Sequence, residues 1–172
     1  IFTGKFTKRI EEFMGQEKEY TGTFVLGSTT PSYDLETSVD ATFSTSHITE
    51  DLIHATTGKF TGSIQQKPPV FSALKKDGKR LYEFARAGEE VEIPTREVHI
   101  SSFKITRIAL PEVDFEVRCS KGTYIRSLAN DFGKALDSGA HLSALRRTQI
   151  GDYNVDDAIT LEEFESALSA RI

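Results

Sequence analysis

Within Cys119-Ser120-Lys121-Gly122-Thr123-Tyr124-Ile125-Arg126 the sequence changes from the periodicity of a strand to that of a helix. Before this segment, apolar and charged residues alternate over 113–117, which is the period of two of a half-buried strand. After it, large apolar residues recur every fourth position over 128–136, as in an amphipathic helix. A Gly-Thr turn separates the two patterns. We therefore expect a strand-turn-helix unit that presents Tyr124 and Arg126 at a junction where a pocket can form.

Arg126 requires an anionic or polar partner at this junction, and the local pattern fits two interpretations about equally. In the first, the guanidinium forms an ordinary pair on the helix surface with Asn130 or Asp131, which lie one turn away. In the second, its planar fork holds a functional anion inside the pocket.

The rest of the chain mixes strands and helices without regular alternation. The other predicted elements are strands at 18–26 and 98–108 and helices at 49–58, 78–88 and from residue 160 onward. The longer strand carries an irregularity near Ser101-Ser102. This order favours an α+β fold with a largely antiparallel mixed sheet flanked by helices.

The composition is that of an ordinary globular protein. Of the 172 residues, 38% are apolar and 27% are charged, which is sufficient for one domain with its own core. We expect a single domain over 1–172, whose last part, 152–172, is an acidic helical segment. No apolar run is long enough to span a membrane. The single Cys119 cannot form an internal disulfide, and this favours the reducing cytoplasm.

No metal or cofactor site is indicated by the sequence. The four histidines do not combine with Cys119 in the spacing of a metal site; they are His47, His54, His99 and His141. No Gly-rich phosphate-binding motif occurs either. We therefore expect neither a metal nor an organic cofactor.

The net charge of −5 is unevenly distributed. Residues 152–172 contain six acidic residues and one basic residue, so the remainder carries 20 of each. Basic residues gather in two places; the first group is Lys67, Lys75, Lys76, Lys79 and Arg80, and the second is Lys121, Arg126, Arg146 and Arg147. Two such patches on a neutral body can bind a phosphate backbone. The alternative is a solvated lysine-rich turn and a helix edge.

Several motifs occur in the order found in one protein family. They are Lys18-Glu19-Tyr20; Thr29-Thr30-Pro31-Ser32-Tyr33-Asp34; Gln66-Lys67-Pro68-Pro69 through Ser72-Ala73-Leu74-Lys75; Gly78-Lys79-Arg80-Leu81-Tyr82-Glu83-Phe84-Ala85-Arg86-Ala87-Gly88; and the segment 119–126. With these motifs, residues 1–151 resemble the bacterial TruB-type tRNA pseudouridine synthases. The resemblance implies part of the pseudouridine synthase fold and isomerisation of the uridine in the TΨC loop of tRNA.

The resemblance also implies roles for individual residues. Tyr20 matches the tyrosine that lies against the target base and is a candidate to remove the C5 proton, whereas its ordinary interpretation is a half-buried strand tyrosine. Arg126 matches the arginine that pairs with the catalytic aspartate. Tyr124 and Leu145 match substrate contacts, although Leu145 also fits plain core packing. Asp34 either forms its loop or orients Tyr20 and the substrate.

One expected residue has no counterpart in this chain. In the family, the nucleophilic aspartate lies in a Gly-rich loop. That loop precedes the family segment to which residues 1–8 of this chain correspond. We therefore expect residues 1–172 alone to be inactive. The rival interpretation is a non-catalytic module that binds tRNA, and the basic residues fit both.

Overall fold

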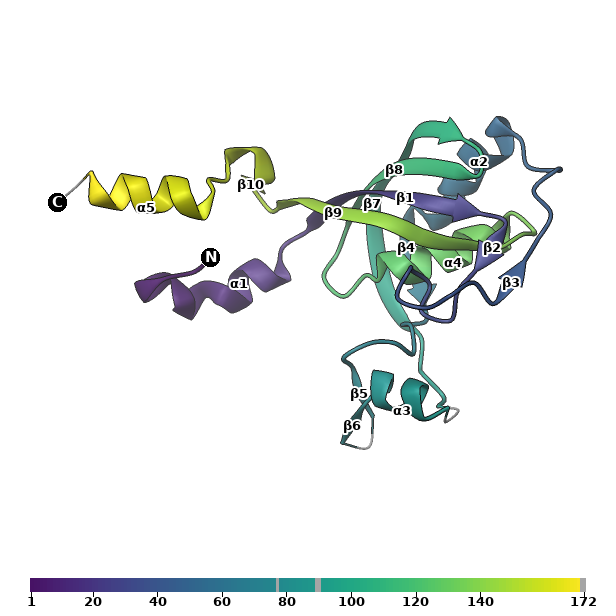
Figure 1. Cartoon of the computed structure of the whole chain (residues 1–172), viewed down its shortest axis with the longest axis horizontal. Helices are drawn as coiled ribbons and strands as arrows, with labels where there is room; N and C mark the ends of the chain where they lie inside the picture. Colours follow the sequence, from purple (N-terminus) through teal and green to yellow (C-terminus); the bar gives the residue numbers. More distant parts are fainter. Residues whose placement is uncertain (77, 89–90, 171–172) are drawn as a thin grey trace.

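The central element is a six-stranded sheet in the order β10-β9-β1-β8-β7-β4, and each neighbouring pair is antiparallel (Figure 1). The computed structural model describes residues 1–76, 78–88 and 91–170. The strands are β1 (Lys18–Leu26), β4 (Gly62–Gln66), β7 (Arg96–Ala109), β8 (Glu112–Cys119), β9 (Ala140–Ile150) and β10 (Tyr153–Asn154). The α+β fold with a largely antiparallel sheet is confirmed.

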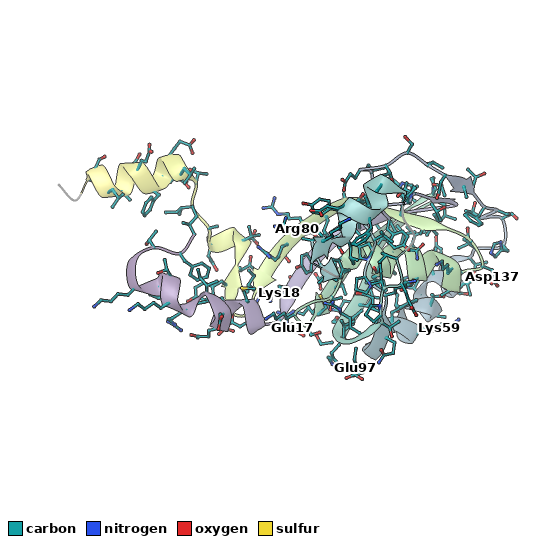
Figure 2. The ribbon with its side chains drawn as sticks, turned by 90° about the horizontal axis from the view of Figure 1, so that it is seen from below. Glu17, Lys18, Lys59, Arg80, Glu97 and Asp137 are labelled. Atoms are coloured by element: carbon teal, nitrogen blue, oxygen red, sulfur yellow. The ribbon has the colours of Figure 1, made fainter. Side chains whose placement is uncertain are left out.

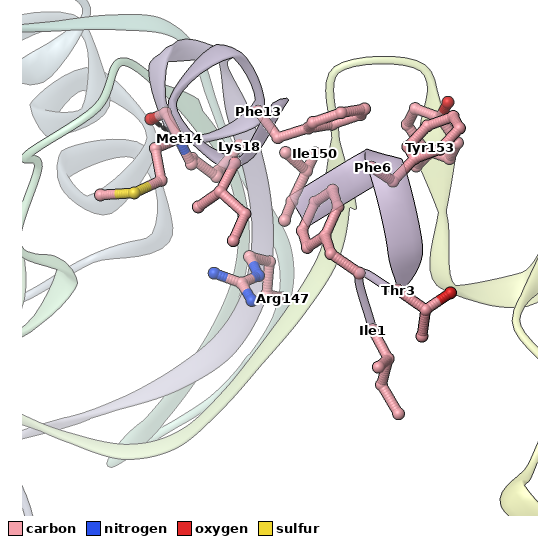
Figure 3. A pocket seen from close by; sticks show the side chains of 11 residues that line it. Ile1, Thr3, Phe6, Phe13, Met14, Lys18, Arg147, Ile150 and Tyr153 are labelled. Atoms are coloured by element: carbon pink, nitrogen blue, oxygen red, sulfur yellow. Dashed lines mark hydrogen bonds between the residues drawn. The ribbon is translucent and has the colours of Figure 1, made fainter. Parts of the chain in front are cut away.

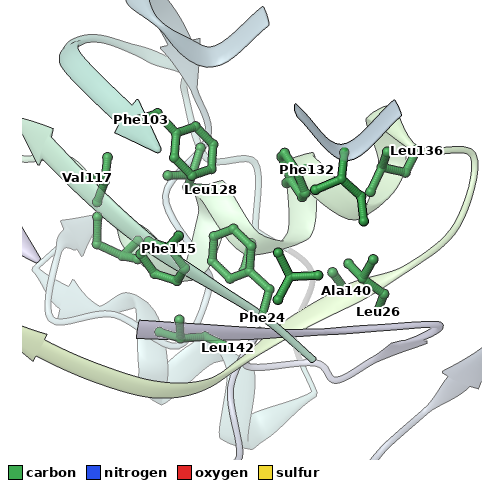
Figure 4. Packing of buried hydrophobic residues seen from close by; sticks show 14 of the residues in the cluster. Phe24, Leu26, Phe103, Phe115, Val117, Leu128, Phe132, Leu136, Ala140 and Leu142 are labelled. Carbon is green, nitrogen blue, oxygen red and sulfur yellow. The ribbon is translucent and has the colours of Figure 1, made fainter. Parts of the chain in front are cut away.

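Two helices, α2 (Glu50–Thr57) and α4 (Ile125–Ala135), contribute to one core with the sheet. Phe24 of β1 stacks on Phe115 of β8 with ring centroids 4.2 Å apart. Phe132 of α4 closes the cluster at 5.6 Å from both Phe24 and Phe103 (Figure 4). All four rings are buried, so the aromatic cluster fixes α4 against the sheet.

The predicted strand-turn-helix unit is confirmed. Alternate residues of β8, including Cys119, are buried, and Gly122 makes the turn with a φ of +86° that glycine adopts readily. Helix α4 then begins at Ile125 and buries its apolar stripe. Burial raises the pKa of the Cys119 thiol to about 11, which keeps it protonated and unreactive at neutral pH.

Most other predicted elements also occur where expected. The helix predicted at 78–88 is shorter, Leu81–Ala87, because Lys79 and Arg80 pair as a strand with Lys75 and Lys76. Strand β1 has the predicted bounds, and Thr49 caps α2 by accepting a hydrogen bond from the backbone N–H of Leu52. The irregularity in β7 is a register shift between Ile100 and Ser102. Thr160 and Glu163 form the capping box of α5 (Leu161–Ser169).

Smaller elements project from this body in two directions (Figure 1). One is a lobe made of β5 (Lys75–Lys76), β6 (Lys79–Arg80) and α3 (Leu81–Ala87). To the side, beyond the β9-β10 end of the sheet, lie the helices η1 (Gly4–Arg9), α1 (Ile10–Gly15) and α5. The remaining short elements are β2 (Ser28–Thr29), β3 (Ala41–Thr42), η2 (Gly58–Phe60) and η3 (Val155–Asp157). In the described ranges, no helix has both the length and the apolar character needed to span a membrane.

Candidate active site

Arg126 lies in the first turn of α4, with 21% of its side chain exposed, and reaches across to two other segments. Its Nη1 lies 3.3 Å from Oδ2 of Asp34 and donates to the carbonyl oxygen of Ser32 at 3.4 Å. Its Nη2 donates to the carbonyl oxygen of Phe71 at 2.8 Å. The planar fork thus joins the helix to the loop around Asp34 and to the segment that leads into the lobe.

These contacts contradict the interpretation of Arg126 as a surface residue paired within its own helix. Asp131 instead accepts a hydrogen bond from Asn130 at 3.2 Å. The anionic partner of Arg126 is Asp34, which comes from a distant part of the sequence.

Asp34 also organises its own loop. Its Oδ1 accepts hydrogen bonds from Ser32 Oγ at 2.6 Å and from the backbone N–H of Glu36 at 2.9 Å. Thr30 Oγ1 donates to the Asp34 carbonyl oxygen at 2.6 Å. One carboxylate oxygen therefore shapes the loop while the other faces Arg126, so the loop-forming role of Asp34 is confirmed. Its orientation of Tyr20 or of a substrate stays a prediction.

A cavity of about 370 Å³ adjoins this ion pair. Asp34, Arg126 and Leu145 all line it, together with neighbouring residues of β9. Leu145 is 46% exposed, so plain core packing does not describe it. The structure thus brings together three of the five residues for which the family resemblance implies a role.

Tyr20 reaches the same region through the register of the sheet. It pairs with Arg147, and Gly22, two residues later, pairs with Leu145. Paired residues share a sheet face, so Tyr20 and Leu145 are diagonal neighbours on one face, roughly 7–8 Å apart. Tyr20 is also half-buried against the core, as its ordinary interpretation expected.

The Tyr20 hydroxyl is protonated at neutral pH. Burial raises the pKa of Tyr20, the nearby Cys119 raises it further, and a hydrogen bond with Arg147 opposes both effects. Arg147 is therefore the group that favours ionisation of this phenol.

Tyr124 occupies the N-cap position of α4, and its backbone is hydrogen-bonded to the side chain of Gln66. The sequence motifs gave Gln66 no role. Gln66 is fully buried at the end of β4. The alternation of β4 offered a signal, because period two places Gln66 on the same inward face as Ile64. A buried amide on that face requires hydrogen-bond partners.

Four of the five residues of the first basic group belong to the strands of the lobe, and Lys67 precedes it. Lys67, Lys79 and Arg80 are exposed, and Figure 2, seen from below, shows the side of the molecule that carries Arg80. The side chains of Lys75 and Lys76 lie outside the described part of the structure. Arg126 faces the lobe through a second cavity of about 300 Å³, which Ser72 and Tyr82 also line.

The second basic group is divided by the sheet. Lys121 is exposed in the turn after β8. Arg146 and Arg147 are exposed on β9, not on a helix edge, and as consecutive strand residues they point to opposite faces. Only Arg147 shares the face of Tyr20.

A further cavity lies away from Arg126, between the N-terminal helices and the β9-β10 end of the sheet (Figure 3). It measures about 530 Å³, and its lining is mostly apolar, with Phe6, Phe13 and Tyr153 beside Arg147. The charged side chains that line it, Lys18 and Arg147, are both cationic. In the described ranges, no group of three or more His, Cys, Asp or Glu side chains is placed to hold a metal ion.

Two family profiles match consecutive parts of the chain. Residues 1–125 match the N-terminal domain of the TruB family pseudouridylate synthases, and residues 126–171 match the C-terminal domain of tRNA pseudouridylate synthase B. The boundary falls at the start of α4, so the cavity beside Arg126 combines residues from both matched ranges.

Bacterial relatives match along almost the whole chain. A tRNA pseudouridine synthase B from Flavobacterium johnsoniae is 67% identical over 168 residues, which is 98% of this chain and 73% of the relative. The protein of that name from Phocaeicola vulgatus is 52% identical over 164 residues, which is 95% of this chain and 70% of the relative.

A solved structure shares the fold. A chain in the crystal structure of a Cbf5-Nop10-Gar1 complex matches with a TM-score of 0.69 and 27% identity. The match covers 98% of this chain, which spans 42% of that longer chain. Together with the two profiles, these similarities show that the chain belongs to the TruB family of pseudouridylate synthases.

Proposed function

We propose that this protein is a tRNA pseudouridine synthase that isomerises the uridine of the TΨC loop. The observation that carries this assignment is the Arg126 guanidinium, held by Asp34 and two carbonyl oxygens at the edge of a cavity within a TruB-family chain. The reaction breaks the C1′–N1 glycosidic bond and forms a C1′–C5 bond, while C5 releases a proton and N1 takes one up. The target base must leave the stack to reach such a cavity.

The residues around the cavity fit separate parts of this reaction. Arg126 would hold the nucleophilic aspartate of the family ionised and oriented, because opposite charge at a few ångströms favours the carboxylate. Tyr20 would lie against the extruded base. To accept the C5 proton, its hydroxyl must first be in the phenolate form, which Arg147 favours, and the transfer returns it to the neutral phenol. Tyr124 and Leu145 would contact the nucleotide.

Partners and location follow from the proposed reaction. The substrate is tRNA, and we propose that the protein acts on it in the cytoplasm. The isomerisation moves bonds within one nucleotide and needs no electron acceptor, so we propose that no metal or organic cofactor takes part. The shared core, which draws on residues from β1 to β9, supports our proposal that residues 1–172 form a single domain.

Tritium release from tRNA labelled at uracil C5 tests the function. The protein in the full length encoded by its gene is expected to release tritium from the TΨC-loop uridine, whereas residues 1–172 alone are expected to release none, because positioning cannot replace the carboxylate nucleophile. A transcript with cytidine at that position is the control. Tight tRNA binding by the full-length protein without any release would favour the binding module instead.

The lobe is expected to bind phosphates of the tRNA backbone. Changing Lys79 and Arg80 together to Ala should weaken tRNA binding and reduce the slope of log affinity against log salt by about one unit for each phosphate that is no longer neutralised. Lys59 is equally exposed but lies on η2, outside the two basic groups, so Lys59→Ala is the matched control. Binding measured at several salt concentrations checks this, and an unchanged slope in the double variant would mean that both residues are merely solvated.

A further inference from the structure

We propose that Gln66 is a positioning residue that fixes the first turn of α4, and with it Arg126 and Tyr124, for the reaction; the inference rests on the proposed function. Gln66 is the last residue of β4 and is fully buried. Its Nε2 donates to the Tyr124 carbonyl oxygen at 3.0 Å, and its Oε1 accepts from the Tyr124 backbone N–H at 2.8 Å. One side-chain amide thus binds both backbone groups of one residue, as a neighbouring strand would.

The bound residue is the one where α4 needs support. Tyr124 is the N-cap residue of α4, and its side chain makes no capping hydrogen bond. The Tyr124 carbonyl oxygen accepts from the Leu128 backbone N–H at 3.1 Å, but its own N–H has no partner inside the helix, and such a donor is costly to leave unsatisfied when buried. The Gln66 amide supplies that partner from the sheet, because β4 is paired along its whole length with β7.

Two further hydrogen bonds continue the same connection along residues 66–71, here called the anchor segment. The Lys67 carbonyl oxygen accepts from Ser127 Oγ at 2.7 Å, and Ser127 is buried. The Phe71 carbonyl oxygen accepts from Arg126 Nη2 at 2.8 Å. The N-cap residue Tyr124 and two residues of the first turn, Arg126 and Ser127, are therefore hydrogen-bonded to one short segment. This segment continues directly into the basic lobe.

This arrangement predicts a specific defect when the Gln66 amide is removed. The first turn of α4 would keep its apolar packing but lose the hydrogen bonds that set its position, so Arg126 would shift relative to the cavity. A displacement of about 1 Å at a catalytic group can cost on the order of a hundredfold in rate. The exposed basic residues of the lobe would remain, so tRNA affinity would change little.

Gln66→Met tests the proposal in the full-length protein, since methionine has a similar length without the hydrogen-bonding groups. We expect the single-turnover rate at saturating enzyme to fall by at least about tenfold, with the Kd for tRNA within about twofold. Gln65→Met is the matched control, because Gln65 precedes it on the same strand but is exposed, and it should match the parent in both quantities. A rate for Gln66→Met within about twofold of the parent, or an equal fall in rate and affinity, would overturn the proposal.

A second variant and a second readout keep the test decisive. Ser127→Ala removes another hydrogen bond of the anchor segment with little change of shape. It should also lower the single-turnover rate, and it serves as the test if Gln66→Met does not fold. Amide hydrogen exchange over residues 125–128 should quicken in Gln66→Met and not in Gln65→Met. Because this exchange does not require turnover, an inactive parent protein would refute the proposed function, whereas unchanged exchange in Gln66→Met would refute the anchor.

Discussion

Replacing Arg126 with Lys is expected to lower the single-turnover rate of uridine isomerisation by about a hundredfold or more. The guanidinium uses Nη1 and Nη2 to meet Asp34, Ser32 and Phe71, which belong to two different segments. An ammonium group keeps the charge but has no planar fork that could span these acceptors and still orient a carboxylate. The loss should therefore appear in turnover and not in tRNA affinity.

Arg118→Lys provides the matched comparison. Arg118 also pairs with a carboxylate, Glu19, at 2.9 Å, but it is 41% exposed on the sheet surface. Such a pair contributes at most about 1 kcal/mol to stability, so this variant should retain the parent rate. Single-turnover rates at saturating enzyme, measured beside a melting curve for each variant, decide the matter. A rate for Arg126→Lys within a fewfold of the parent would show that Arg126 does not hold the aspartate.

Among the proposed substitutions, Phe132→Ala is expected to destabilise the protein most, lowering the free energy of unfolding by about 3–5 kcal/mol. Phe132 is fully buried and contacts Phe24, Phe60 and Phe103, so its removal leaves a cavity where α4 meets the sheet. The adjacent Gly133 limits how far the helix can move to close that cavity. A Cβ at Gly133 would lie 2.3 Å from the Ala140 nitrogen, which shows how closely α4 already approaches β9.

Phe164→Ala is the control for this change. Phe164 lies on α5, far from α4 in Figure 1, and is 46% exposed, so its replacement should alter the free energy of unfolding by less than about 0.5 kcal/mol. Denaturant unfolding of both variants beside the parent measures the difference. Equal stabilities of the two variants would mean that the aromatic cluster does not hold α4 in place.

The local elements were predictable from the sequence because each depends on neighbouring residues. The change of period around 119–126 located β8, the turn and α4, and Thr160 with Glu163 located the start of α5. The partners of Arg126 were not predictable in this way. Ser32 lies 94 residues away in the sequence, and no periodic pattern encodes which loop a side chain will meet.

Gln66 was missed for a related reason. Gln66 is the last residue of a strand, two positions before Pro68-Pro69, and a polar residue is ordinary at such a loop boundary. Only the three-dimensional arrangement shows that it is buried and that both of its amide atoms meet Tyr124, 58 residues away. Sequence reasoning thus found three cavity-lining residues, Asp34, Arg126 and Leu145, through the family resemblance, but not the contacts that hold them in position.

Strand β9 is buried at one end and exposed at the other. Its first three residues, 140–142, are buried against α4 and the core, whereas residues 144–147 are exposed. Of these, Ala144 and Leu145 line the cavity beside Arg126, and Arg147 shares the sheet face of Tyr20. Natural variation can therefore alter the exposed end without loosening the core, while the buried end keeps the exposed one in register. A library randomised at 144–147 should yield mostly folded proteins that differ in substrate preference, and one randomised at 140–142 should yield mostly unfolded ones.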